Sequence, residues 1–299
     1  MSGSSVDYRC LLAAVDLGDM TERVLDRAVD LGARCDAPVE VANVLEGMPV
    51  FLYHAIAPEE LQTMLDRSTE SSRERLGKLA ERRPGIRGTH TVMGILAEEA
   101  RALADRIGSD LLVIGAHERH GMAILFRDRS DEILHKAGRD TLVVKQTTPH
   151  VPPYRHVLAA VDLGGRGQPV VTRAARIAGL YGASLTLLHV IDCFPVDRSN
   201  TLIAPEDRDP LAYEREDSLS QLEALASKAG VAQCRQEVVV SAHKASREIP
   251  AFAAANGVDL VVTGSHGPYG LGRLLGSTAD GIVHRAPCDV LVVRLPAAV

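Results

Sequence analysis

The chain has 299 residues, of which 46% are hydrophobic and only 3% aromatic, with no tryptophan. This length allows about two domains of ordinary size, each large enough to bury its own core. The formal net charge of −6 gives no reason to expect a nucleic acid or an anionic membrane surface as a partner.

The cysteines and the hydropathy indicate a cellular setting. The five cysteines form no C-x-x-C pair, which favours reduced thiols over a disulfide framework. The N-terminal residues are polar, and no later run reaches the roughly 18 apolar residues that a membrane span requires. We therefore expect a cytoplasmic protein with no membrane segment.

The first half alternates apolar runs with segments of helical period. Val-rich runs bounded by Gly are typical of strands buried on both faces of a parallel sheet. In chain order we expect a strand (Leu11–Asp16), a helix (Glu22–Arg34), a strand (Val39–Leu45), a charged helix (Pro58–Arg82), a third strand, a helix (Ala97–Ile107), a fourth strand, a fourth helix and a closing strand (Thr141–Lys145).

The second half repeats this order. The sequence LLAAVDLG at Leu11–Gly18 matches VLAAVDLG at Val157–Gly164 in seven of eight positions, and LLVIGAH at Leu111–His117 aligns with LVVTGSH at Leu260–His266. The elements expected there are strands over Val157–Asp162, Ser184–Ile191 and Val290–Arg294, with helices over Val170–Tyr181, Asp209–Lys228 and Ser246–Ala255.

This repetition predicts two domains, residues 1–148 and 154–299, joined by a proline-rich connection. Alternating strands and helices imply parallel pairing through right-handed crossovers. The predicted fold class is therefore α/β, with two tandem doubly wound parallel sheets.

Glycines gather after the fourth strand of the second half. Gly264, Gly267 and Gly276 lie in this segment, and Ser277-Thr278 begins the fourth helix. Glycines let a backbone approach phosphate oxygens, and a helix N-terminus offers free N–H donors with a partial positive charge. Ser277 and Asp280 have the spacing of a capping box. The pattern favours a phosphate site.

Two common phosphate motifs are absent. No glycine is followed by Lys-Ser or Lys-Thr, as a Walker A loop requires. Leu275 stands where a dinucleotide fingerprint needs its final Gly or Ala.

The segment Gly264–Arg294 resembles the C-terminal signature of the ATP-binding branch of the universal stress proteins. That signature is G-x2-G-x9-G-[ST], and here eight residues separate Gly267 from Gly276. The resemblance covers both halves, because the family includes tandem members. It implies an adenine nucleotide alpha hydrolase-like, Rossmann-like fold and a role as a stress-response sensor or regulator that binds ATP or a related adenine nucleotide, with or without Mg²⁺.

The resemblance also implies contacts residue by residue. The family's adenosine contacts at the first strand fall on Ala160, Val161 and Asp162, and Val190 meets adenine through its backbone. The residues expected to hold ribose and phosphates are Thr263, Gly264, Gly267, Gly276, Ser277 and Thr278. The family's dimers imply an intrachain pseudo-dimer of the two domains and also allow a homodimer.

Some of these residues have a simpler interpretation. Val161 and Val190 also suit a core. Asp162 follows a buried strand and needs a partner, which could be a ligand hydroxyl or amino group, or a neighbouring backbone N–H.

The first half departs from the signature at the central positions. Glu118, Arg127, Asp128 and Arg129 stand where the second half has Gly267, Gly276, Ser277 and Thr278. Two carboxylates beside a polyphosphate would repel it. We expect the first domain to lack a working nucleotide site.

Other chemistry is less well supported. His117, Glu118 and His120 crowd one loop but fit no standard zinc spacing. No catalytic residue for hydrolysis can be named, so a slow ATPase stays a third hypothesis. The second hypothesis is a small-molecule-binding or protein-interaction module without nucleotide, which the shortened loop favours. The long stretch Asp192–Pro210 suits a lid.

Overall fold

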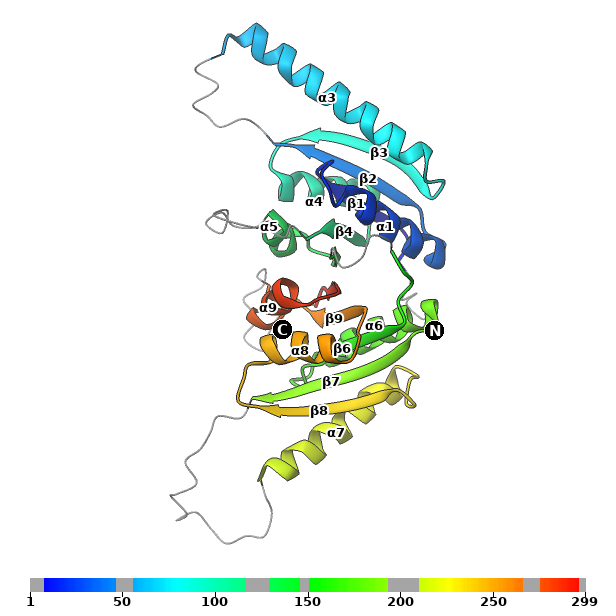
Figure 1. Ribbon diagram of the computed structural model, residues 1–299, viewed down its shortest axis with the longest axis vertical. Helices are drawn as coiled ribbons and strands as arrows, with labels where there is room; N and C mark the ends of the chain where they lie inside the picture. Colours follow the sequence, from blue (N-terminus) through cyan, green and yellow to red (C-terminus); the bar gives the residue numbers. More distant parts are fainter. Residues whose placement is uncertain are drawn as a thin grey trace. The chain divides into compact units, whose positions relative to one another are not determined.

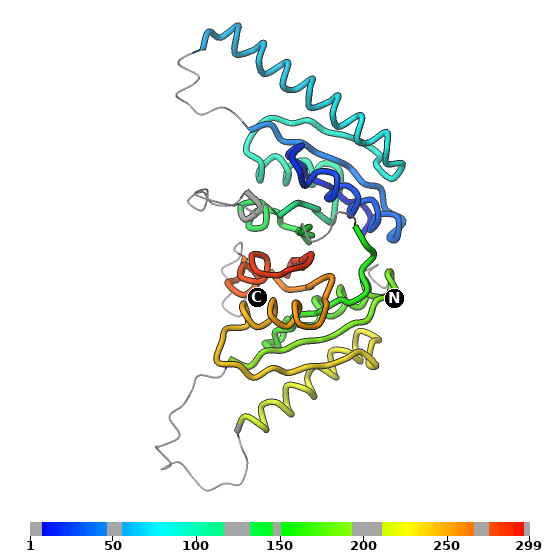
Figure 2. The backbone as a smooth tube through the Cα atoms, viewed as in Figure 1, coloured from blue at the N-terminus to red at the C-terminus, as the bar shows by residue number. Residues whose placement is uncertain are grey.

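The chain divides into two compact units, residues 1–153 and 154–299. The computed structural model describes residues 8–46, 56–116, 129–145, 151–192, 210–265 and 275–295. Figure 1 shows the helices and strands, and Figure 2 traces the same backbone as a tube. Every helix of the described residues is too short or too polar to cross a membrane.

The first unit is built on a parallel sheet with the strand order β3-β2-β1-β4-β5. Its elements are β1 (Leu11–Val15), α1 (Thr21–Cys35), β2 (Val39–Leu45), α3 (Pro58–Glu81), β3 (Ile86–Met93), α4 (Leu96–Ile107), β4 (Leu111–Gly115), α5 (Arg129–Lys136) and β5 (Asp140–Val144). All residues of β1 and β5 are buried, as their apolar composition predicts for strands covered on both faces.

The second unit repeats this order, with strands β8-β7-β6-β9-β10. Its elements are β6 (His156–Ala160), α6 (Gly167–Tyr181), β7 (Ser184–Asp192), α7 (Pro210–Lys228), β8 (Arg235–Ser241), α8 (Ala245–Ala255), β9 (Leu260–Gly264), α9 (Ser277–Arg285) and β10 (Asp289–Val293). The doubly wound parallel sheet that the strand–helix alternation predicts is thus confirmed in both units.

Helices pair on each face of the sheets. In the second unit α6 contacts α7, and α8 contacts α9. In the first unit α4 contacts α5, while Arg83, after α3, forms ion pairs with Glu22 and Asp26 of α1. In each unit the first two helices therefore lie together and the last two lie together, so that the two pairs cover opposite faces, as a doubly wound sheet requires.

A buried tyrosine ties the start of each unit to its last strand. The Tyr8 hydroxyl donates to Asp140 at 2.8 Å, and the Tyr154 hydroxyl donates to Asp289 at the same distance. Both pairs are buried. Because β5 and β10 are the last strands of their units in chain order, this bond joins the start and the end of each unit, which lie more than 130 residues apart in the sequence.

We expect Tyr154→Phe to lower the free energy of unfolding by about 1–3 kcal/mol, because it removes a donor from a buried carboxylate and keeps the ring. Urea unfolding followed by circular dichroism measures the change. Tyr213, whose side chain is 61% exposed, supplies the control: Tyr213→Phe should change the value by less than about 0.5 kcal/mol. Equal effects of the two variants would contradict the role of Tyr154 in joining the start and the end of its unit.

Candidate functional site

The winding of the second unit reverses between β6 and β9. From β6 the chain adds β7 and β8 on one side, then crosses over to add β9 and β10 on the other. In such sheets the loops that follow the two central strands leave toward opposite faces, and a crevice opens beyond their carboxyl ends.

A cavity of about 210 Å³ lies at this point. An apolar cavity of about 150 Å³ can hold benzene, so this one has room for a larger ring. The residues that line it are Ala160, Val161, Asp162, Arg166, Val170, His189, Val190, Ala245, Ile249, Thr263, Gly264, Gly276, Thr278, Ala279 and Leu295.

Eight of the ten residues predicted from the sequence line this cavity. The exceptions are Ser277, which is exposed at the start of α9 but is not a lining residue, and Gly267, which lies outside the described residues. Strands β6, β7 and β9 and helix α9 supply the eight, so segments far apart in the sequence meet at one place.

The apolar part of the wall is also core. Val161 and Val190 are 5% and 8% exposed, and Thr263 is 4% exposed. These residues therefore belong to the core and also line the cavity. For the two valines, a core role and a ligand contact are compatible.

Asp162 differs from the expectation of a buried carboxylate. The residue is exposed, and its Oδ1 accepts a hydrogen bond from the Gly164 N–H at 3.0 Å. The strand ends at Ala160, so Asp162 already belongs to the turn, where water reaches it. Asp16 makes the same bond to Gly18 at 2.9 Å, which identifies the backbone N–H as one partner in both units.

The predicted capping box is wrong. Gly276, not Ser277, is the N-cap of α9, and no side chain caps this end of the helix. Gly276 takes the extended conformation of an N-cap, and its N–H donates to the Ser265 carbonyl at 2.8 Å. The helix therefore starts one residue earlier than the box requires, and its first N–H groups receive no side-chain cap at the cavity wall.

Ser265 anchors this wall, although the sequence analysis did not single it out. It is buried, its N–H donates to the Val293 carbonyl at 2.9 Å, and its hydroxyl accepts the Leu295 N–H at 3.1 Å. The end of β9, the end of β10 and the start of α9 are thus held together through one residue.

His189 was also missed. Its Nδ1 lies 2.9 Å from the Val161 carbonyl oxygen. A carbonyl only accepts, so Nδ1 donates and Nε2 of the neutral ring remains an acceptor. Asn43 occupies the matching place in the first unit, where its amide donates to the Val15 carbonyl at 2.8 Å. A comparison of matching positions in the two halves of the sequence could have identified His189.

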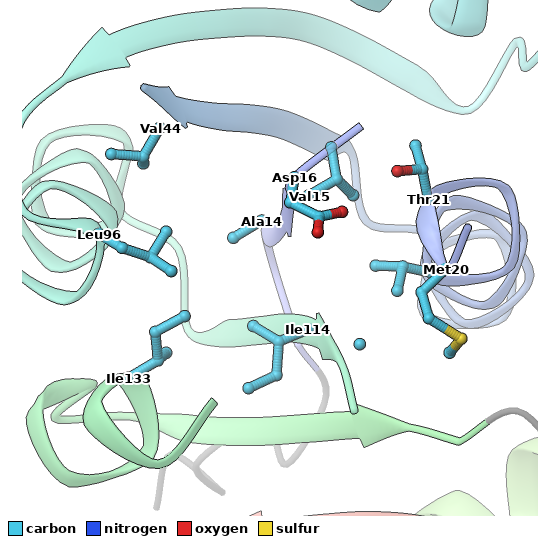
Figure 3. Close-up of a pocket in the computed structure, with 11 residues that line it drawn as sticks. Ala14, Val15, Asp16, Met20, Thr21, Val44, Leu96, Ile114 and Ile133 are labelled. Carbon is cyan, nitrogen blue, oxygen red and sulfur yellow. The ribbon is translucent and has the colours of Figure 1, made fainter. Parts of the chain in front are cut away.

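The first unit has a cavity at the matching place, but its volume is only about 50 Å³. Figure 3 shows Leu96, Ile114 and Ile133 around this cavity, with Met20 opposite them at the start of α1. Leu96 stands where the second unit has Ala245, and Ile114 where it has Thr263. Larger apolar side chains therefore narrow this part of the first unit's crevice, although a cavity of about 600 Å³ opens beside it, between α3 and the ends of β1, β2 and β3, with Asp16, Asn43 and Val44 in its wall.

The described residues offer little other chemistry. No group of three His, Cys, Asp or Glu residues in the described parts could hold a metal ion. Burial raises the pKa of the Cys10 and Cys234 thiols, so neither is prepared as a thiolate nucleophile. Outside the described residues lie His117, Glu118, His120, Arg127, Asp128 and most of the expected lid, 193–209.

Comparison with known proteins places the chain in a family. The model of the universal stress protein family matches residues 7–145 and again residues 153–294. Universal stress protein A homolog 1 of Coxiella burnetii is 36% identical over 140 residues, which are 47% of this chain and 96% of that protein.

One solved structure shares the fold over nearly the whole chain. A universal stress protein from Archaeoglobus fulgidus matches 97% of both chains with a TM-score of 0.69 and 18% identity. A universal stress protein in complex with cAMP matches 48% of this chain and 100% of its own, with a TM-score of 0.37 and 25% identity. Because the family model covers both halves, the chain belongs to the universal stress protein family and carries its domain twice.

Proposed function

We propose that the second unit binds ATP or a related adenine nucleotide, and that the protein acts as a stress-response sensor or regulator. One observation carries the proposal: the crevice at the switch point of the second unit is open and bordered by glycines and an uncapped helix start, whereas Leu96 and Ile114 narrow the first unit's crevice where Ala245 and Thr263 line the second. The two units share one scaffold, so the difference lies in their side chains, as expected if those of the second unit serve a ligand.

The apolar wall suits the base. Val190 lies two residues beyond Leu188, the last residue of β7 in register with β6. Its backbone therefore continues past the β6–β7 ladder at the cavity wall, where it can meet the edge of adenine. Val161 and Ile249 supply buried apolar surface beside it, as ring systems require.

The polar wall suits the ribose and the phosphates. The start of α9 presents N–H groups without a side-chain cap, and Gly276 and Thr278 line the cavity there. A phosphate is the group that such a helix start accepts. Asp162 accepts Gly164 through Oδ1, and its carboxylate also has Oδ2 for a ribose hydroxyl. Where ATP is the ligand, Mg²⁺ arrives bound to its phosphates.

We expect the purified protein to release adenine nucleotide at about one molecule per chain when it is denatured, because Leu96 and Ile114 narrow the first unit's crevice where the second unit would hold the ligand. Mass spectrometry of the supernatant identifies the ligand, and titration of stripped protein measures the stoichiometry. Two nucleotides per chain would contradict the inequality of the units. Absence of any adenine nucleotide in both measurements would favour the second candidate, a small-molecule-binding or protein-interaction module, which the eight-residue spacing supports.

Ala245→Leu should weaken binding, because it gives the second unit's cavity wall the leucine that the first unit has at Leu96. We expect a loss of at least about tenfold in affinity by titration calorimetry. Ala251→Leu is the matched control, since Ala251 is exposed on the same helix and should bind as the wild type does. Unchanged affinity in Ala245→Leu would show that the ligand does not enter this cavity.

Gly267→Glu gives the second unit the residue that the first unit has at Glu118, and we expect it to lose the nucleotide through charge repulsion. Asp16→Ala changes the first unit instead and should retain it. Nucleotide kept by Gly267→Glu but lost by Asp16→Ala would move the site to the first unit.

The pairing of the two units into a pseudo-dimer, a homodimer and a cytoplasmic location stay predictions from the sequence.

A further inference from the structure

An arginine at the second unit's cavity has one nitrogen without a partner in the described parts of the chain. Arg166 lines the cavity and is the N-cap residue of α6. Its Nη1 is buried, and it has no hydrogen-bond partner among the described residues. A guanidinium is always charged and carries only donors, so leaving one of its nitrogens buried without an acceptor is unfavourable.

Asp162 does not serve as the missing acceptor. It is the other charged residue along the described cavity wall, and its Oδ1 accepts a hydrogen bond from the Gly164 N–H. Within the described parts of the chain, no ion pair connects it with Arg166. Among the described residues, Arg166 at the cavity wall therefore has no acidic partner.

We propose that Arg166 binds an anionic group of the ligand, and that this group is a phosphate of the adenine nucleotide. The inference rests on the proposed function and adds the residue that selects nucleotides over nucleosides. A phosphate matches the planar fork of a guanidinium and accepts its donors in pairs. The N-terminus of α9 opens on the same cavity through Gly276 and Thr278, so two sources of positive potential meet there.

The first unit has an uncharged residue at the position that matches Arg166. Met20 is the N-cap residue of α1, in the place that Arg166 has in α6, and it lines the smaller cavity. Methionine is an apolar side chain that fills gaps. The exchange of Met20 for Arg166 thus accompanies the opening of the crevice, as expected if the arginine serves the ligand rather than the fold.

The test is calorimetric titration of the full-length, nucleotide-stripped protein with ATP and, separately, with adenosine. In Arg166→Met, which copies the first unit, ATP affinity should fall roughly 10- to 100-fold, the loss expected when a charged hydrogen bond is removed. Adenosine affinity should change less than about threefold, because adenosine has no phosphate. Arg166→Lys keeps the charge without the fork and should lie between wild type and Arg166→Met.

Arg215→Met is the control for net charge, since Arg215 is exposed on α7, and it should bind both ligands as the wild type does. The inference is overturned if Arg166→Met keeps its ATP affinity, or if it loses ATP and adenosine equally, which would mean a structural role. A wild type that binds neither ligand overturns the proposed function itself, and that result is distinct from a wild type that binds ATP regardless of Arg166.

Discussion

The site in each unit depends on one topological constraint. A parallel sheet that grows outward from a central strand must reverse its direction once, and the helices on the two sides of the reversal leave toward opposite faces. In the second unit this happens between β6 and β9, where α6 and α9 pair with different neighbours. The loops diverge there, and the crevice exists before any functional side chain is chosen.

The two units differ in the side chains that line this crevice. Leu96, Ile114 and Met20 narrow it in the first unit, and full burial of a side chain such as Ile114 or Met20 stabilises a fold by about 1.5–3 kcal/mol. The second unit forgoes part of this packing and leaves a buried nitrogen of Arg166 without a described partner. A bound nucleotide would offset both costs, since a ligand that binds only the folded state stabilises it.

Most residues of the candidate site could be predicted from the sequence, but the residues that distinguish the two units could not. Gly264, Gly276 and Thr278 stood out because glycines near a helix start are a local pattern, and the structure brings them to one cavity. Arg166, His189 and Ala245 carry no such pattern. These three residues matter because of the residues that face them across the cavity. From the sequence, only a comparison of matching positions in the two halves could have identified them. The capping box failed because helix starts shift by one residue with the local backbone.

The sequence by itself determined the duplication, the order of strands and helices, and the parallel winding, because these follow from hydrophobic period and from repetition along the chain. It also located the glycine segment that follows β9. The tertiary structure alone decided that larger side chains narrow the first unit's crevice, that Asp162 is exposed, and that Arg166 lines the cavity with a buried nitrogen that has no described partner. These properties depend on where each strand ends and on side chains that separate segments bring to one place, and no pattern along the sequence records either.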